Sequence, residues 1–228
     1  MHLDMNSYFA SVEQQANPFL RGRPVGVCAY LSPGGCIIAS SVEAKAKGVK
    51  TGFRVRDAKQ LCPEIFLIEN EPAKYRTVTE NIFKILAEYT DTLEPYSIDE
   101  AFLDLTGWAE ERIVRIKHPE IWKSQKLETG IQEREVQKPI LEPFVINEPA
   151  AHSWIPHQVR DDNNNEARSG EEDDFYWAKV IASIIRERIK REVGEWMHCS
   201  IGISYTKFLA KFASDIAPKK GILVIRNQ

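Results

Sequence analysis

The sequence lacks long apolar runs and any cysteine pattern typical of disulfides or metal sites. No apolar stretch approaches the roughly 18 to 20 residues that span a bilayer, and residues 1–10 carry an acid where a secretory signal would be apolar. The four cysteines form no CxxC pair, and the five histidines are scattered. These absences exclude a disulfide framework and a zinc site of ordinary spacing. They predict a cytoplasmic protein with reduced thiols and no membrane partner.

The chain also lacks a strong net charge, with 30 basic and 33 acidic side chains. Residues 109–174 hold fifteen of the acids but only nine of the bases, so the rest leans slightly basic. The densest basic stretch, residues 45–59, has one acid, Asp57, among Lys45, Lys47, Lys50, Arg54, Arg56 and Lys59. On charge alone, a phosphate-binding surface and an ordinary solvated helix fit this stretch equally well.

Hydrophobic periodicity indicates short strands between amphipathic helices. Strands are predicted at 1–5, 25–30, 36–39, 197–204 and on both sides of Asp99 and Glu100. One helix is predicted from Pro72 to Tyr89, and another ends before Gly194. Residues 109–174 have no sustained period and are rich in Pro, Asn and acids, which predicts a disordered insertion.

Apart from residues 17–71 and 109–174, the predicted order is strand, helix, strand, strand, helix, strand. This is the ferredoxin-like (βαββαβ) order, so we predict an α+β fold with a small α/β domain inserted at 17–71. In this topology the first strand lies beside the central hairpin. Asp4 should therefore meet Asp99 and Glu100 on one sheet, although they are far apart in the chain.

Three carboxylates at one sheet edge repel one another unless a cation neutralises them. Oxygen ligands without His or Cys select Mg²⁺ or Mn²⁺. Two such ions, about 3.5–4 Å apart, clamp the attacking and leaving oxygens of a phosphoryl transfer. The alternative is structural, because acids are common in hairpin turns and Asp4 can cap the following helix. Spacing alone leaves both interpretations open.

Four segments resemble signature stretches of one enzyme family and occur in that family's order. They are LDMNSYFASVEQ (3–14), VEAKAKGVKTG (42–52), PYSIDEAFLDLTG (95–107) and IGISYTKFLAKFASD (201–215). The chain resembles the Y-family translesion DNA polymerases, and within them the DNA polymerase IV branch, whose catalytic module is also named after the UmuC protein. The resemblance covers the chain except for the insertion. It implies template-directed nucleotidyl transfer during the bypass of DNA damage.

The resemblance assigns the metal ligands. It implies that Asp4, Asp99 and Glu100 are catalytic and hold two Mg²⁺ ions, with Mn²⁺ as a substitute. The backbone carbonyl of Met5 is expected to help hold the ion that accompanies the nucleotide. Asn6 stands where many relatives have a second acid, so it is not expected to be a ligand.

The resemblance also assigns a nucleotide site. Phe9 falls at the steric-gate position, where a ring rejects a ribose 2′-hydroxyl, although a helix core role also fits its spacing. The backbone N–H groups of Tyr8 and Phe9 suit a triphosphate because a helix N-terminus favours anions. Lys207 matches the lysine that reaches the phosphates. Lys211, one turn further on, is expected to be a solvated lysine or to touch the DNA backbone.

The region that resembles the fingers departs from the family pattern. Relatives commonly place threonine, tyrosine and arginine on the triphosphate, where this chain has Ala39, Val42 and Lys45. Two hydroxyl donors are missing, and lysine offers a point charge in place of a bidentate fork. We therefore expect weaker nucleotide binding, or contacts redistributed to Ser40 or Ser41, with Lys45 still at the site.

The resemblance implies domain limits. Residues 1–16, 72–108 and 175–214 correspond to the palm, 17–71 to the fingers and 215–228 to the start of a thumb. The rest of the thumb and the little finger have no counterpart, so we expect a weak grip on DNA. The implied partners are primer-template DNA and dNTP, with a sliding clamp bound through the missing C-terminal region. The chain is expected to be a monomer.

Two alternative functions stay open at this point. One is a catalytically inactive fragment that binds DNA or a protein partner. The other is a palm-type nucleotide cyclase, because cyclases combine a ferredoxin-like sheet with paired metal-binding acids. The fingers-like region and the Phe9 gate argue against the cyclase, since neither has a purpose there.

Overall fold

The computed structural model describes residues 1–106, 170–218 and 220–226. A central five-stranded sheet has the order β5-β6-β1-β7-β8. Its strands are β1 (His2–Met5), β5 (Leu93–Pro95), β6 (Glu100–Leu103), β7 (Cys199–Ile203) and β8 (Ile222–Val224). The first four pair antiparallel, and β8 runs parallel to β7. The order β5-β6-β1-β7 confirms the predicted βαββαβ arrangement.

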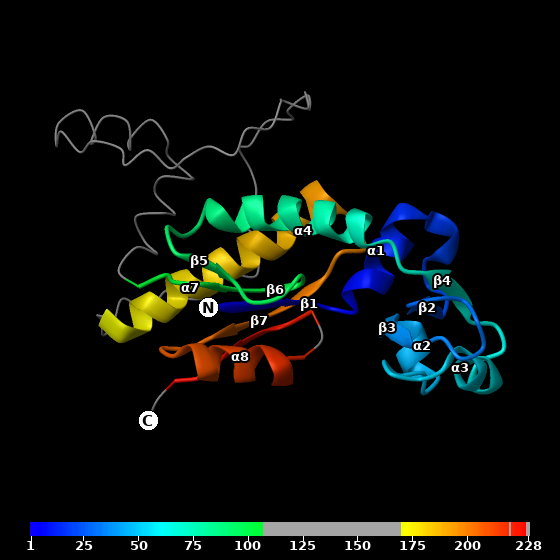
Figure 1. The fold of residues 1–228 in the computed structure, drawn as a ribbon. Helices are drawn as coiled ribbons and strands as arrows, with labels where there is room; N and C mark the ends of the chain where they lie inside the picture. Colours follow the sequence, from blue (N-terminus) through cyan, green and yellow to red (C-terminus); the bar gives the residue numbers. More distant parts are fainter. Residues whose placement is uncertain (107–169, 219, 227–228) are drawn as a thin grey trace, which may run out of the picture.

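Helices cover both faces of this sheet. Figure 1 shows α4 (Pro72–Ala87) and α7 (Gly170–Arg188) over one face and α8 (Lys207–Ile216) over the other. A π-helical turn, η3 (Ile189–Val193), continues α7, and α1 (Tyr8–Ala16) follows β1 directly. The main core lies between the sheet and the helices α4 and α7. Its fully buried members include Leu3, Ile82, Ile181 and Ile201.

The starts of two helices can be compared with the sequence prediction. Pro72 occupies the first turn of α4, where its missing N–H costs no hydrogen bond. The helix α7 begins at Gly170. The predicted insertion is therefore wrong at its last five residues, 170–174, which are helical. Its residues 109–169 lie outside the described part of the chain.

Residues 17–71 contain a second, three-stranded sheet of order β3-β2-β4. Its strands are β2 (Val25–Cys28), β3 (Ile37–Ser40) and β4 (Phe66–Glu69). Three short helices accompany them: η1 (Pro18–Leu20), α2 (Val42–Ala46) and α3 (Val55–Leu61). This three-stranded unit has its own small core around Ile37 and Val55. The β2–β3 hairpin confirms the sequence prediction, whereas β4 is not predicted from the sequence.

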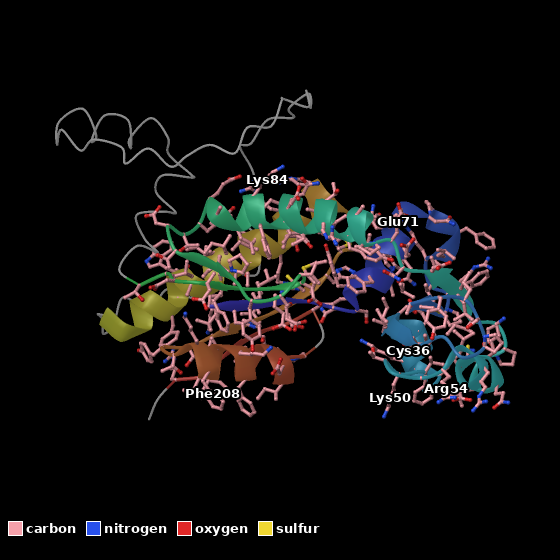
Figure 2. All side chains as sticks on the ribbon, in the orientation of Figure 1. Cys36, Lys50, Arg54, Glu71, Lys84 and Phe208 are labelled. Carbon is pink, nitrogen blue, oxygen red and sulfur yellow. The ribbon has the colours of Figure 1, made fainter. Side chains whose placement is uncertain are left out.

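The basic stretch at residues 45–59 lies on the outside of the three-stranded unit. All six of its lysines and arginines are exposed, and Figure 2 shows Lys50 and Arg54 at the surface. Lys47 is paired with Glu64, and Arg56 with Asp57. Exposure of this kind fits both interpretations of the stretch, a phosphate-binding surface and a solvated one.

The last described residues belong to the central sheet. The domain boundary predicted at residue 215 falls inside α8, and residues 222–224 form β8. The register Ile201↔Ile222 and Ile203↔Val224 fixes β8 as the sheet's edge strand. These residues therefore extend the sheet instead of leaving it.

Candidate functional site

The three predicted acids gather at one end of the central sheet. Asp4 and Glu100 are direct partners across the antiparallel β1–β6 pair, so their side chains leave the same face. Asp99 precedes Glu100, and its carbonyl oxygen accepts a hydrogen bond from the Met5 N–H at 3.0 Å. The Asp99 carboxylate accepts a hydrogen bond from the Ser97 hydroxyl at 2.7 Å. The fold thus places Asp4 beside Glu100, as the predicted strand order requires.

Burial and like charges disfavour the ionised form of two acids in this cluster. Burial, together with the neighbouring carboxylates of Glu100 and Asp99, raises the pKa of Asp4 to about 7, and burial is the largest cause. Burial also raises the pKa of Asp99, which the Ser97 hydrogen bond opposes. Near neutral pH, Asp4 is therefore only partly ionised. A bound cation would restore its charge.

Glu100 already has a counter-ion, which the sequence pattern did not identify. The Lys211 ammonium on α8 lies 2.6 Å from the Glu100 carboxylate. On the other side, Nε2 of the fully buried His2 lies 3.3 Å from Glu100 without making a hydrogen bond, while Nδ1 is 2.7 Å from the Ser214 hydroxyl. Burial and the Lys211 charge lower the pKa of His2 to about 4, so this ring is neutral at pH 7.

The acids fit a magnesium ion in chemistry but not in their present arrangement. Within the described residues, no group of three or more His, Cys, Asp or Glu side chains is arranged to hold a metal ion. All three candidate side chains offer hard oxygen ligands, which Mg²⁺ prefers. Binding at Glu100 would require its carboxylate to leave Lys211. The raised pKa of Asp4 is the observation that favours a cation.

The N-terminus of α1 begins directly beyond these acids. Ser7, at its N-cap, has a left-handed backbone with φ of 51° and makes no side-chain capping bond. The first N–H groups of a helix have no partner within the helix, so they face outward as donors. The Tyr8 hydroxyl is anchored on α4, where it donates to the Tyr75 carbonyl at 2.8 Å. An uncapped helix start of this kind favours anions.

The Phe9 ring packs on α4. It stacks on Tyr75 with ring centroids 4.4 Å apart and planes 20° apart, and it is partly buried. The half-exposed ring has one face on Tyr75, so both sequence interpretations, gate and core, remain compatible with its position.

Lys45 reaches the same helix start from the three-stranded unit. Its ammonium donates to the Ser7 hydroxyl at 2.8 Å. Val42, one turn earlier, is exposed. Ser40 lies beneath and is buried, and its hydroxyl has no hydrogen-bond partner within the described residues. Ser41 is used structurally, since its hydroxyl caps α2 at the Ala44 N–H.

Lys207 lies away from the acids. Its ammonium pairs with Glu94 of β5 and lies 5.9 Å from the Phe102 ring centroid. Lys211, one turn further along α8, is the lysine that meets the cluster. The spacing of YTKFLAK puts both lysines on one helix face. Only the packing of α8 against β1 decides which of them lies over the acids.

The fold is that of Y-family DNA polymerases. A crystal structure described as DinB from Sulfolobus solfataricus superposes with a TM-score of 0.65 at 22% identity, over 99% of this chain and 47% of that one. A ternary complex of Dbh gives 0.66 at 23% identity, with 99% and 47% coverage. Identities this low establish the fold alone. Among the described residues, none of the helices combines the length and apolar character needed to span a bilayer.

The chain belongs to the impB/mucB/samB family, whose profile matches residues 3–215. It is 32% identical over 228 residues to DNA polymerase IV of Bacillus velezensis, covering 100% of this chain and 39% of the relative. It is 33% identical over 225 residues to DNA polymerase IV 2 of Agrobacterium fabrum, covering 99% of this chain and 44% of the relative. The chain thus spans less than half the length of these relatives.

Proposed function

We propose that this chain carries the nucleotidyl-transfer site of a Y-family translesion DNA polymerase. The observation that carries the proposal is the register of Asp4 opposite Glu100, beside the uncapped start of α1. A metal-binding acid pair next to an anion-binding helix start suits a nucleoside triphosphate and its cations. In this proposal the central sheet with α1, α4, α7 and α8 is the palm, and the three-stranded unit is the fingers.

The proposed role of each residue follows from its charge and its position. Asp4, Asp99, Glu100 and the Met5 carbonyl would hold two Mg²⁺ ions, which, when bound, stabilise the charge on the attacking and leaving oxygens. The N–H groups at the start of α1 would bind the triphosphate, with Lys45 beside them. Phe9 would face the sugar with the ring face that Tyr75 does not cover. DNA is the second substrate, in line with the ternary complex among the structural relatives.

A second candidate is a DNA-binding part without catalysis. The Lys211–Glu100 ion pair at 2.6 Å favours it, since this pair withholds one of the three proposed ligands from a cation. The two candidates differ in whether Mg²⁺ displaces Lys211.

Primer extension separates them. The purified chain is given primer-template DNA, Mg²⁺ and dNTPs, beside an Asp99→Ala/Glu100→Ala variant. We expect extension that falls by about a hundredfold or more in the variant, because transition-state charge stabilisation of this size is lost. Equal extension by both proteins would identify a contaminating polymerase and contradict the proposal. No extension by the native chain, with DNA binding retained, would support the second candidate.

The gate and the triphosphate contact have separate tests. Phe9→Ala should increase incorporation of ribonucleotides relative to deoxyribonucleotides, whereas Phe19→Ala, which removes an exposed ring elsewhere, should leave this ratio unchanged. Lys45→Ala should raise the KM for dNTP, whereas Lys47→Ala, whose amine pairs with Glu64, should not. An unchanged KM in Lys45→Ala would remove Lys45 from the site.

A further inference from the structure

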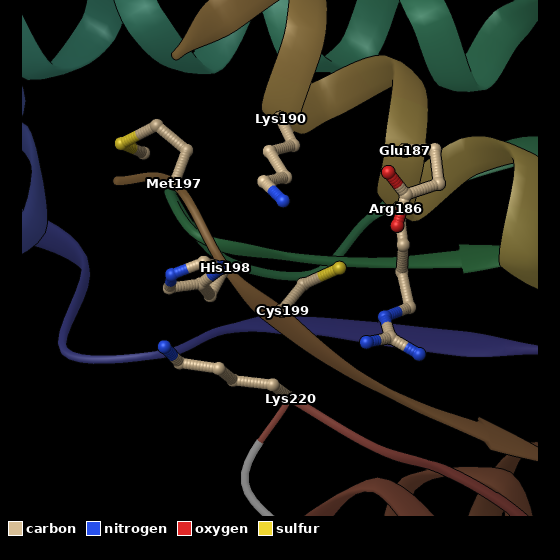
Figure 3. A pocket seen from close by; sticks show the side chains of 7 residues that line it. All are labelled: Arg186, Glu187, Lys190, Met197, His198, Cys199 and Lys220. Atoms are coloured by element: carbon tan, nitrogen blue, oxygen red, sulfur yellow. The ribbon is translucent and has the colours of Figure 1, made fainter. Parts of the chain in front are cut away.

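A cavity of about 190 Å³ lies at the start of β7. It is bounded by the end of α7 and η3 on one side and by the turn before β8 on the other. Figure 3 shows four nitrogen-bearing side chains around it, from Arg186, Lys190, His198 and Lys220. Met197 and Cys199 complete the wall. None of the proposed metal or nucleotide residues lines this cavity.

The cations of this basic pocket are not neutralised. Within the described residues, Arg186, Lys190 and Lys220 form no ion pair, and Glu187 is the one carboxylate in the wall. By contrast, Arg188, two residues after Arg186, does have carboxylate counter-ions. Its guanidinium pairs with Glu88 and with Glu192, at 2.8 Å for the latter. In the part of the chain that the structure describes, the three cations of the pocket thus lack the carboxylate partners that Arg188 has.

The pKa of His198 is sensitive to the positive charges of the pocket. Burial, together with the charges of Lys220, Lys190 and Arg186, lowers this pKa to about 4, and burial is the largest cause. The ring is thus neutral at pH 7 and can hydrogen-bond to a ligand without adding charge. Three cations against one carboxylate leave an excess of positive charge around the cavity.

Two backbone features of the pocket are unusual. Lys220 has φ of 64°, a left-handed conformation that costs a non-glycine residue roughly 1–2 kcal/mol. Lys190 lies in the π-helical turn, a form that often occurs at functional sites. Strain of this kind is typical of places where a ligand is bound.

We propose that the basic pocket binds a phosphate group. The volume is below the roughly 300 Å³ of ordinary small-molecule pockets, but it exceeds the roughly 30 Å³ of a water several times over. It therefore suits a phosphate group and not a whole nucleotide. A guanidinium and two ammonium groups are the usual partners of phosphate oxygens. The phosphate comes either from the backbone of a nucleic-acid strand or from free phosphate. The inference does not depend on the proposed polymerase function.

A double variant tests the pocket against a matched control. Lys190→Gln/Lys220→Asn removes two cations, and asparagine tolerates the left-handed backbone at position 220. Lys84→Gln/Lys179→Gln makes the same charge change at exposed positions on α4 and α7 outside the pocket. The probes are inorganic phosphate, by calorimetry, and a single-stranded DNA 12-mer, by fluorescence anisotropy over a salt series. We expect the pocket variant to weaken binding about tenfold, and the control less than about twofold.

The two probes distinguish the sources. Loss of oligonucleotide binding alone, with a shallower salt dependence, assigns the pocket to a phosphodiester. Loss of phosphate binding alone assigns it to free phosphate, and loss of both assigns it to either source. Equal binding by the pocket variant and the control would overturn the proposal.

A measurement on the native chain makes the test independent of whether the variants fold. Saturating phosphate or oligonucleotide should raise the pKa of His198 well above 4, because the bound anion cancels the neighbouring positive charges. The pKa is followed by NMR titration of the His198 ring, with chloride at equal ionic strength as reference. A His198 pKa that neither ligand moves would contradict the proposal.

Discussion

The same end of the central sheet carries two charge clusters of opposite sign. On β1 and β6, Asp4 lies among carboxylates and has a pKa raised to about 7. Beside the start of β7, His198 lies among cations and has a pKa lowered to about 4. In both cases burial is the largest cause, and like charges add to it. Each cluster thus contains one titratable group whose pKa shift reflects both burial and the like charges around it.

The two clusters do not neutralise each other because the strands between them carry neutral groups. Asp4 pairs across β1–β7 with Ser200, whose hydroxyl donates to the Asn6 side chain at 3.1 Å. The Asn6 N–H donates to the His198 carbonyl at 2.8 Å, which ties the two sides together through the backbone alone. The two proposed sites, one for cations and one for anions, lie on either side of this backbone hydrogen bond.

The largest expected effect is on the pH dependence of stability. The Asp4 pKa is about 7 in the folded chain and 3.8 ordinarily, so the folded state binds the proton more tightly. Stability is then lost as pH rises between these values. Without metal, we expect the Asp4 proton alone to lower the unfolding free energy by about 2 kcal/mol from pH 5 to pH 8. His2 and His198, whose pKa values are lowered to about 4, act in the opposite direction, so the effect is read from a difference between proteins. Relative to Asp4→Asn, the native chain should lose about 2 kcal/mol over this range, measured by urea unfolding of both proteins at each pH.

Asp104→Asn is the control for Asp4→Asn. The Thr106 hydroxyl and N–H lower the pKa of Asp104, so this carboxyl is ionised throughout pH 5 to 8 and contributes no slope there. A native chain whose stability does not fall relative to Asp4→Asn over this range would contradict the raised pKa of Asp4. The contrast with the basic pocket would then fail.

The next effect concerns the lysine that partly neutralises the acids. Lys211→Gln should tighten Mn²⁺ binding about fivefold, since removing a cation near Glu100 and Asp4 is worth about 1 kcal/mol at this half-exposed position. Calorimetry in metal-free buffer measures it. Lys207→Gln, one turn away and paired with Glu94, should change the affinity less than about twofold. Weaker Mn²⁺ binding in Lys211→Gln would mean that Lys211 helps to hold the site together instead of competing with the ion.

Most of the fold could be predicted from the sequence because its elements are local. Pro72 and a sustained helical period predict α4. The turn sequence SPGG at 32–35, between the two predicted strands 25–30 and 36–39, predicts the β2–β3 hairpin. β4 was missed because Phe66–Glu69 is a short run with no alternation, and only its parallel pairing with β2 makes it a strand. β5 ends at Pro95, after which residues 97–99 bend back into β6.

From the sequence, only the part of the site that depends on strand order could be predicted. The ferredoxin-like order placed Asp4 beside Glu100, and the register confirms this. The ion pair of Glu100 with Lys211 depends on how α8 lies across the sheet, which periodicity does not determine. The basic pocket was invisible for the same reason, because Arg186, Lys190, His198 and Lys220 come from three separate elements and form no motif.

The smallest expected effect divides the causes at His198. Because burial lowers its pKa more than any single cation does, Lys190→Gln should raise the pKa of His198 above 4 while leaving it below the ordinary 6.5. NMR titration of the ring measures this in phosphate-free buffer, with Lys179→Gln as the control on the same helix. An unchanged pKa would place the Lys190 ammonium outside the pocket. A full return to 6.5 would mean that charge, and not burial, sets the neutral state of His198, which would make the two clusters differ in cause as well as in sign.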